Sequence, residues 1–232
     1  EWRGLGESNQ RATRECDWGY RELLDRDIAA GISAVRERTG SAPLLIGGHS
    51  LGGQLALIEA SRRRDEIAGS VLVASGHPWW RGFSGARALG VRLFVTAIPL
   101  ITGVCGHFPG RRLGFAGREA ARLMREWALT SRRGDYRMAD FGEELNRALL
   151  EHRGAVFAAT MLEDALAPRA ALDHLRSLAT RAEWEVAEFG RPDFPTRRAD
   201  HFGWLREPAP VASRIAQWLK SRATSPSGTA PA

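Results

Sequence analysis

The 232-residue chain has little cysteine and almost no lysine. Its two cysteines, Cys16 and Cys105, are too few for a disulfide framework and match no metal-site spacing. Lys220 is the only lysine among 33 basic residues, and the arginines are scattered among acidic residues rather than gathered in a stripe. The sequence therefore predicts no metal, no cofactor and no nucleic-acid partner, although its formal net charge is +6.

Long hydrophobic runs are also scarce. Residues 93–104 are apolar throughout, but this run is too short to span a bilayer, and Pro99 interrupts it. We find no signal peptide and expect no stable membrane insertion. With 44% hydrophobic residues, the chain instead predicts one α/β domain with a substantial core. The sequence does not indicate an oligomeric state.

The most informative motif is G-H-S-L-G at positions 48–52, with Ser50 at its centre. A short apolar strand pattern, residues 43–47, precedes it, and the good helix formers of residues 54–60 follow it. G-x-S-x-G between a strand and a helix is typical of a nucleophile elbow, a strained turn that lifts a serine hydroxyl above the end of a sheet. The alternative is an ordinary loop serine among glycines.

A catalytic serine needs a base and a third group that orients the base. The apolar residues 155–162 are predicted to form a strand, which Glu163 and Asp164 follow, and Pro168 is well placed to open the next helix. An acidic residue between that strand and helix would lie at the carboxyl edge of the sheet. We predict that Asp164 is the orienting acid. Glu163 is the alternative, because a strand boundary can shift by one residue.

His201 is the predicted base. It lies in a loop after the last predicted strand, residues 183–189, and before a C-terminal helix with apolar residues at helical spacing. Serine, acid and histidine then follow in the chain order expected for this elbow. The alternative is a solvated loop histidine.

These motifs resemble those of α/β-hydrolases, close to bacterial predicted hydrolases related to monoglyceride lipases and lysophospholipases. The resemblance covers nearly the whole chain, from Glu1 to about Arg222. Residues 2–8 match the family's D-x-R-G-x-G-x-S segment after its fourth strand, and residues 48–53 match its elbow. Asp164 with Pro168 matches its acid loop, and residues 201–203 match its histidine loop. It implies an α/β fold with a mostly parallel sheet flanked by helices.

The resemblance also implies an activity: a serine hydrolase that cleaves a carboxylic ester, such as a small lipid-like acyl ester, through an acyl-enzyme on Ser50. His201 would be general base and acid, Asp164 the orienting carboxylate, and the backbone N–H of Leu51 one oxyanion-hole donor. The second donor would come from a loop before Glu1. We therefore expect that three strands and a helix, roughly 50 residues, are missing from the start. An acyltransferase on the same triad and a non-catalytic binding protein are the alternatives.

The alternation of strands and helices breaks between Pro78 and about Glu151. In this fold, an insertion here is usually a helical cap over the serine. We expect a hydrolase core at residues 1–77 and 152–222, a cap at residues 78–151 and a disordered tail at residues 223–232. The predicted substrate-pocket residues are His49, His77, Trp79 and Trp80. The bacterial resemblance favours a cytoplasmic location, although the missing start could hold a signal.

Overall fold

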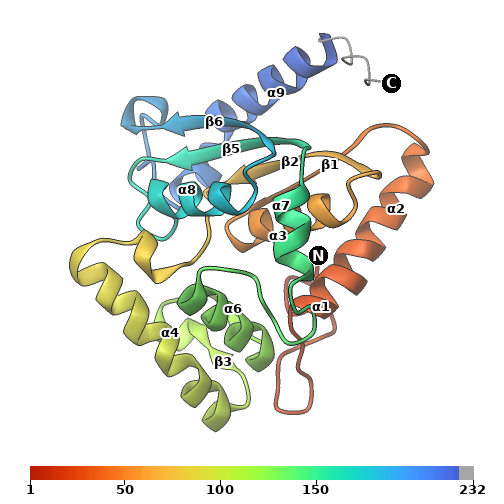
Figure 1. The fold of residues 1–232 in the computed structure, drawn as a ribbon. Helices are drawn as coiled ribbons and strands as arrows, with labels where there is room; N and C mark the ends of the chain where they lie inside the picture. The colour runs from red at the N-terminus through yellow and green to blue at the C-terminus, as the bar shows by residue number, and fades with distance from the viewer. Residues whose placement is uncertain (225–232) are drawn as a thin grey trace.

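The computed structural model describes residues 1–224 and contains a four-stranded, wholly parallel sheet (Figure 1). The strands lie in the order β1, β2, β5, β6, with bounds Leu44–His49, Ile67–Val73, Ala155–Met161 and Glu183–Phe189. All seven residues of β5 are buried, as expected for an inner strand covered on both faces. The predicted α/β fold with a mostly parallel sheet is confirmed.

Helices cover both faces of the sheet. Successive side chains of a strand point to opposite faces, so Val156 and Ala158 of β5 pack in one core and Phe157 and Ala159 in another. The first core contains residues of α3, α7 and α8, which span Leu51–Arg62, Glu144–Glu151 and Arg169–Leu178. The second contains Trp218 of α9, Ala209–Thr224. The sheet is thus the middle layer, with the carboxyl ends of its parallel strands at one edge.

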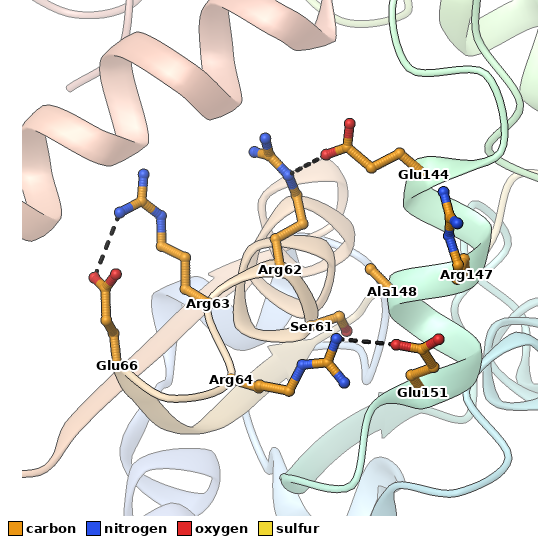
Figure 2. Close-up of a pocket in the computed structure, with 9 residues that line it drawn as sticks. All are labelled: Ser61, Arg62, Arg63, Arg64, Glu66, Glu144, Arg147, Ala148 and Glu151. Atoms are coloured by element: carbon orange, nitrogen blue, oxygen red, sulfur yellow. Dashed lines mark hydrogen bonds and ion pairs between the residues drawn. The ribbon is translucent and has the colours of Figure 1, made fainter.

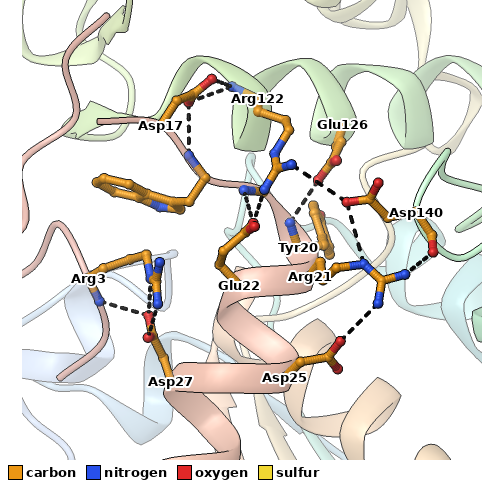
Figure 3. Close-up of polar contacts among 12 residues, drawn as sticks. Arg3, Asp17, Tyr20, Arg21, Glu22, Asp25, Asp27, Arg122, Glu126 and Asp140 are labelled. Carbon is orange, nitrogen blue, oxygen red and sulfur yellow. Dashed lines mark hydrogen bonds and ion pairs between the residues drawn. The ribbon is translucent and has the colours of Figure 1, made fainter. Parts of the chain in front are cut away.

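The N-terminal segment leads into a continuous helical stretch. It consists of α1, the π-helix η1 and α2, with bounds Tyr20–Glu22, Leu23–Ile28 and Ala29–Thr39. Arg3 donates from Nε and Nη2 to the two carboxylate oxygens of Asp27, at 2.8 and 2.7 Å (Figure 3). Arg122 pairs with Glu22, and its backbone N–H donates to Asp17 at 3.0 Å. Charged contacts therefore hold the start of the chain against the inserted segment.

The break in the alternation is a helical insertion. It contains η2, α4, α5 and α6, with bounds Trp80–Gly82, Gly85–Cys105, Gly110–Leu113 and Ala121–Arg133, and the short antiparallel strands β3, Phe108–Pro109, and β4, Arg118–Glu119. Val95 and Ile98 of α4 pack against Met124 and Ala128 of α6, so the insertion has a small core of its own.

The structure differs from the expectations of the sequence at three places. Pro99 does not interrupt the apolar run, because α4 continues through it. Leu145 and Leu149 of α7, a helix expected in the cap, pack in the main core. At the other end, α9 extends to Thr224, two residues into the expected tail, and the rest of that tail, residues 225–232, lies outside the described residues.

Candidate active site

Ser50 occupies the turn between β1 and α3. Its backbone has φ 54° and ψ −121°, a left-handed conformation that a non-glycine residue adopts at a cost. The Ser50 N–H donates to the Val73 carbonyl at 3.0 Å, and a Cβ added to Gly48 would lie 2.4 Å from the carbonyl carbon of Gly52. The turn is therefore tight enough to require glycine at position 48, and the strain is held by the neighbouring strand.

Ser75 also holds the turn. Its hydroxyl donates to the Ser50 carbonyl at 2.7 Å, and the side chain is buried directly beyond the carboxyl end of β2. No role was assigned to Ser75 from the sequence. A buried polar residue at the carboxyl edge, beside the elbow strand, was the available signal.

The structure brings the three predicted triad residues together. The Nε2 atom of His201 lies 3.0 Å from Ser50 Oγ, and its Nδ1 atom lies 2.8 Å from Asp164 Oδ2. Asp164 and His201 are both buried. The second carboxylate oxygen of Asp164 accepts the backbone N–H groups of Leu166 and Ala167, at 2.8 and 2.9 Å. These two bonds fix the carboxylate, which in turn orients the imidazole.

Glu163, the alternative acid, contacts a different part of the histidine loop. Its Oε2 atom accepts the backbone N–H of Ala199 at 3.0 Å, and its own N–H donates to the Ala199 carbonyl at 2.9 Å. Glu163 therefore connects the acid loop to the histidine loop through the backbone. It makes no hydrogen bond to the imidazole of His201 among the described residues.

His49 packs against the same histidine loop. Its Nε2 donates to the His201 carbonyl at 2.9 Å, and the two rings are 4.6 Å apart between centroids. Burial lowers the pKa of His49, and the nearby His201 lowers it further. His49 is therefore held as a neutral donor beside an imidazole that must gain and lose a proton in a triad.

The backbone N–H of Leu51 is the first of α3. It donates no hydrogen bond within residues 1–224, as expected for the first turn of a helix. A helix N-terminus with free N–H groups favours negative charge. Leu51 thus presents a donor next to Ser50, where an oxyanion would form.

His77, Trp79 and Trp80 lie along the junction between the sheet and the insertion. His77 is buried, accepts the Trp79 N–H at Nδ1, and has no hydrogen-bond partner at Nε2. Burial and the neighbouring His174 lower its pKa to about 3. Trp79 lies against His174, at 4.2 Å between centroids, and Trp80 lies under the guanidinium of Arg92. None has a hydrogen bond or ring contact with the triad among the described residues.

An apolar groove adjoins the elbow. Its volume is about 500 Å³, and it is lined by residues of β1, α2 and the elbow, His49, Gly48, Gly52 and Trp2 among them. Of the four predicted pocket residues, only His49 is part of this groove. The groove follows the edge of β1 that pairs with no other strand in residues 1–224.

A second hollow, of about 400 Å³, lies between the end of α3 and α7 (Figure 2). Its charged side chains neutralise one another: Arg62 Nε lies 3.1 Å from a Glu144 carboxylate oxygen, and Arg64 Nη2 lies 2.9 Å from one of Glu151. It contains no triad residue, and its paired charges are better explained by helix packing. Within residues 1–224, no group of three or more His, Cys, Asp or Glu side chains could hold a metal ion.

The comparisons with known proteins agree with this architecture. The model of the family described as serine aminopeptidase, S33, matches residues 1–107. No curated protein matches the sequence.

Three solved structures represent the structural matches. A metagenome-derived lipolytic enzyme is 14% identical, with a TM-score of 0.58 over 91% of this chain and 78% of its own. The monoacylglycerol lipase of Paleococcus ferrophilus is 14% identical, with a TM-score of 0.59 over 95% and 81%. An esterase from Exiguobacterium antarcticum is 16% identical, with a TM-score of 0.58 over 95% and 80%.

At these identities the likeness establishes the fold. The parallel sheet, the strained serine between β1 and α3, and the family model that covers this serine all agree with it. The chain therefore has the α/β-hydrolase fold, and its first 107 residues are similar to the family described as serine aminopeptidase, S33.

Proposed function

We propose that this protein is a serine hydrolase that cleaves carboxylic esters through an acyl-enzyme on Ser50. The observation that carries the proposal is the continuous hydrogen-bonded series from Asp164 Oδ2 to His201 Nδ1, at 2.8 Å, and from His201 Nε2 to Ser50 Oγ, at 3.0 Å. An alcohol becomes a good nucleophile when a base removes its proton and an acid orients that base. Asp164, His201 and Ser50 have the contacts that these roles require.

In the first half-reaction, Ser50 Oγ attacks the ester carbonyl carbon, and its proton moves to His201 Nε2. The carbonyl oxygen becomes an oxyanion, which the Leu51 N–H stabilises at the N-terminus of α3. Asp164 stabilises the imidazolium through Nδ1–H. The bond to the leaving alcohol then breaks, and His201 returns the proton to the alcohol oxygen. The acyl group remains on Ser50.

In the second half-reaction, water replaces the alcohol. His201 removes a proton from the water, whose oxygen attacks the acyl carbon, and the bond to Ser50 Oγ breaks. His201 gives the proton back to Ser50, and the carboxylic acid leaves. An alcohol that takes the place of water would make the protein an acyltransferase, so the two activities differ only in the second acceptor.

Two observations favour an ester as the substrate, and specifically a lipid-like ester. The elbow carries Ser50, whereas haloalkane dehalogenases and epoxide hydrolases of this fold need a carboxylate there. The compared structures are named as a lipolytic enzyme, a monoacylglycerol lipase and an esterase. Apolar side chains are abundant in the insertion, and we propose that it acts as a cap. The substrate-pocket roles of His49, His77, Trp79 and Trp80 are part of this proposal.

The test is a substrate series with the purified full chain and its Ser50→Ala variant. The series contains p-nitrophenyl esters of graded acyl length, with and without an added alcohol, and aminoacyl p-nitroanilides. We expect ester hydrolysis that Ser50→Ala abolishes, with little alkyl ester formed from the alcohol. Alkyl ester as the main product would indicate an acyltransferase, and cleavage of the anilides alone would indicate an aminopeptidase. No turnover of any substrate would favour a binding protein.

A further inference from the structure

Helix α4 of the insertion is apolar on two opposite faces. Val95 and Ile98 point inward to α6, as described above. The opposite face is exposed: the exposed fractions of Leu89, Leu93, Leu100 and Val104 are 57, 62, 72 and 71%. Their spacings of four, seven and four residues keep these four side chains on one side of the helix. We call these four residues the outer stripe.

The outer stripe faces away from the body of the protein. In Figure 1, α4 lies at the edge of the molecule, with α6 and β3 on its inner side. Soluble proteins rarely expose a continuous apolar row, because each such side chain gains free energy on leaving water. The row therefore indicates a surface that is covered by an apolar partner.

The charge around the stripe identifies the chemistry of that partner. No Asp or Glu occurs from Ile67 to Arg118, whereas this stretch has six arginines, all of them exposed: Arg81, Arg87, Arg92, Arg111, Arg112 and Arg118. Arg92 is on α4 itself, and Arg111 and Arg112 are on α5 beside the half-exposed Leu113. Apolar side chains on a segment that carries arginines and no acidic residue match an anionic lipid surface.

The packing of α4 favours a helix that lies along a membrane rather than across it. By length and composition α4 could span one, which corrects the expectation from its shorter apolar run, and it is the one such helix in residues 1–224. A span would, however, separate Val95 and Ile98 from α6. It would also break the hydrogen bond from Arg125 Nε to Thr102 Oγ1, which is 2.8 Å long. These inner contacts are compatible with a helix that enters lipid by one face only.

We propose that the outer stripe of α4 docks this protein onto an anionic lipid surface. The leucines and Val104 enter the boundary between headgroups and acyl chains, and the neighbouring arginines pair with lipid phosphates. Arg87, near the start of α4, donates to the carbonyl of Ala165 at 2.6 Å. The start of α4 therefore adjoins the loop that carries Asp164. The docking itself does not depend on the proposed ester hydrolysis.

Vesicle co-sedimentation of the full chain tests the proposal. The vesicles are phosphatidylcholine alone, and phosphatidylcholine mixed with phosphatidylglycerol, each at low and high salt. We expect binding to the anionic vesicles, weakened by salt. The double variant Leu93→Gln/Leu100→Gln should bind at least about tenfold more weakly, because two inserted leucines are lost. Arg111→Gln/Arg112→Gln should bind roughly tenfold more weakly at low salt.

A matched control distinguishes the stripe from exposed leucines in general. Leu150→Gln changes a leucine on α7 that is 50% exposed, and it should bind like the unmodified chain. All variants should hydrolyse a short, water-soluble p-nitrophenyl ester at the unmodified rate. A failure of docking with normal hydrolysis, or the reverse, therefore tells the two proposals apart.

Four results would overturn the docking proposal. They are no binding of the unmodified chain to anionic vesicles, equal binding by Leu93→Gln/Leu100→Gln, and bound protein that resists alkaline carbonate and so spans the bilayer. The fourth is a dimer of the unmodified chain in sedimentation velocity without lipid, when the variant Leu93→Gln/Leu100→Gln is a monomer. That dimer would show that the stripe is covered by a second copy of the chain.

Discussion

The His49 ring donates from Nε2 to the backbone carbonyl of His201, 2.9 Å away. The elbow is thus bonded to the histidine loop at the residue next to the serine. Burial and the nearby His201 both lower the pKa of His49, which keeps it neutral. A neutral neighbour does not oppose the positive charge that His201 gains during the proposed reaction. We infer that His49 positions His201.

This relationship predicts different effects for two variants of His49. His49→Leu leaves the His201 carbonyl without its donor, and we expect kcat to fall about tenfold. His49→Gln keeps an N–H donor and should recover part of this loss. Steady-state kinetics on a soluble ester checks both. Equal losses in the two variants would attribute the effect to packing of the ring rather than to the hydrogen bond.

The two neighbouring acidic residues should respond very differently to loss of charge. Asp164→Asn removes the carboxylate that accepts Nδ1–H of His201, and we expect kcat to fall by roughly 10³- to 10⁴-fold. Glu163→Gln keeps an oxygen that can accept the Ala199 N–H, so the rate should change less than about threefold. Circular dichroism of both variants controls for folding. A reversed order of the two effects would make Glu163 the orienting acid.

The insertion is expected to select acyl length, with Trp80 as the residue to test. Trp80→Ala should change the ratio of rates on short and long esters more than it changes the melting temperature. Trp127 is the control, because it packs beside Phe115, at 5.5 Å between centroids, in the core of the insertion. Trp127→Ala should mainly lower stability, since it removes a packed aromatic ring. A uniform loss on all esters in Trp80→Ala would assign it a structural role as well.

Buried His77 predicts a pH dependence of stability. Its pKa is about 3 in the folded protein, below the ordinary value of 6.5, so between these values the unfolded chain binds a proton that the folded chain does not. The free energy of unfolding should therefore fall as pH decreases through this window, by up to about 1.4 kcal/mol per pH unit from this group. Urea unfolding at several pH values should show that the free energy of unfolding changes less steeply with pH in His77→Asn than in the unmodified chain.

The fold, and the contacts that join Ser50, His201 and Asp164, could be predicted from the sequence because local patterns mark these positions. The G-x-S-x-G motif has a strand on one side and a helix on the other, and the acid and histidine follow later strands in the expected order. The choice of Asp164 over Glu163 agrees with the geometry, in which only Asp164 contacts the imidazole. Their catalytic roles stay predictions until they are tested.

The rest depends on contacts between residues far apart in the chain. Proline removes a helical hydrogen bond and usually ends a helix, yet α4 continues through Pro99 because Val95 and Ile98 on its inner face pack on α6. The hydrogen bonds of Ser75 to Ser50 and of His49 to His201 link different loops. The spacing of apolar residues along the sequence does not predict such contacts. The placement of α7 on the main core is likewise a matter of tertiary packing.

The most direct test of the proposed chemistry is the labelling of Ser50 by a fluorophosphonate probe, which reacts with an activated serine. Mass spectrometry of the labelled chain should locate the probe on Ser50 alone. Ser50→Ala should lose both the label and ester hydrolysis, by several orders of magnitude in rate. A label that persists in Ser50→Ala, or ester hydrolysis that survives it, would contradict the assignment of Ser50 as the nucleophile.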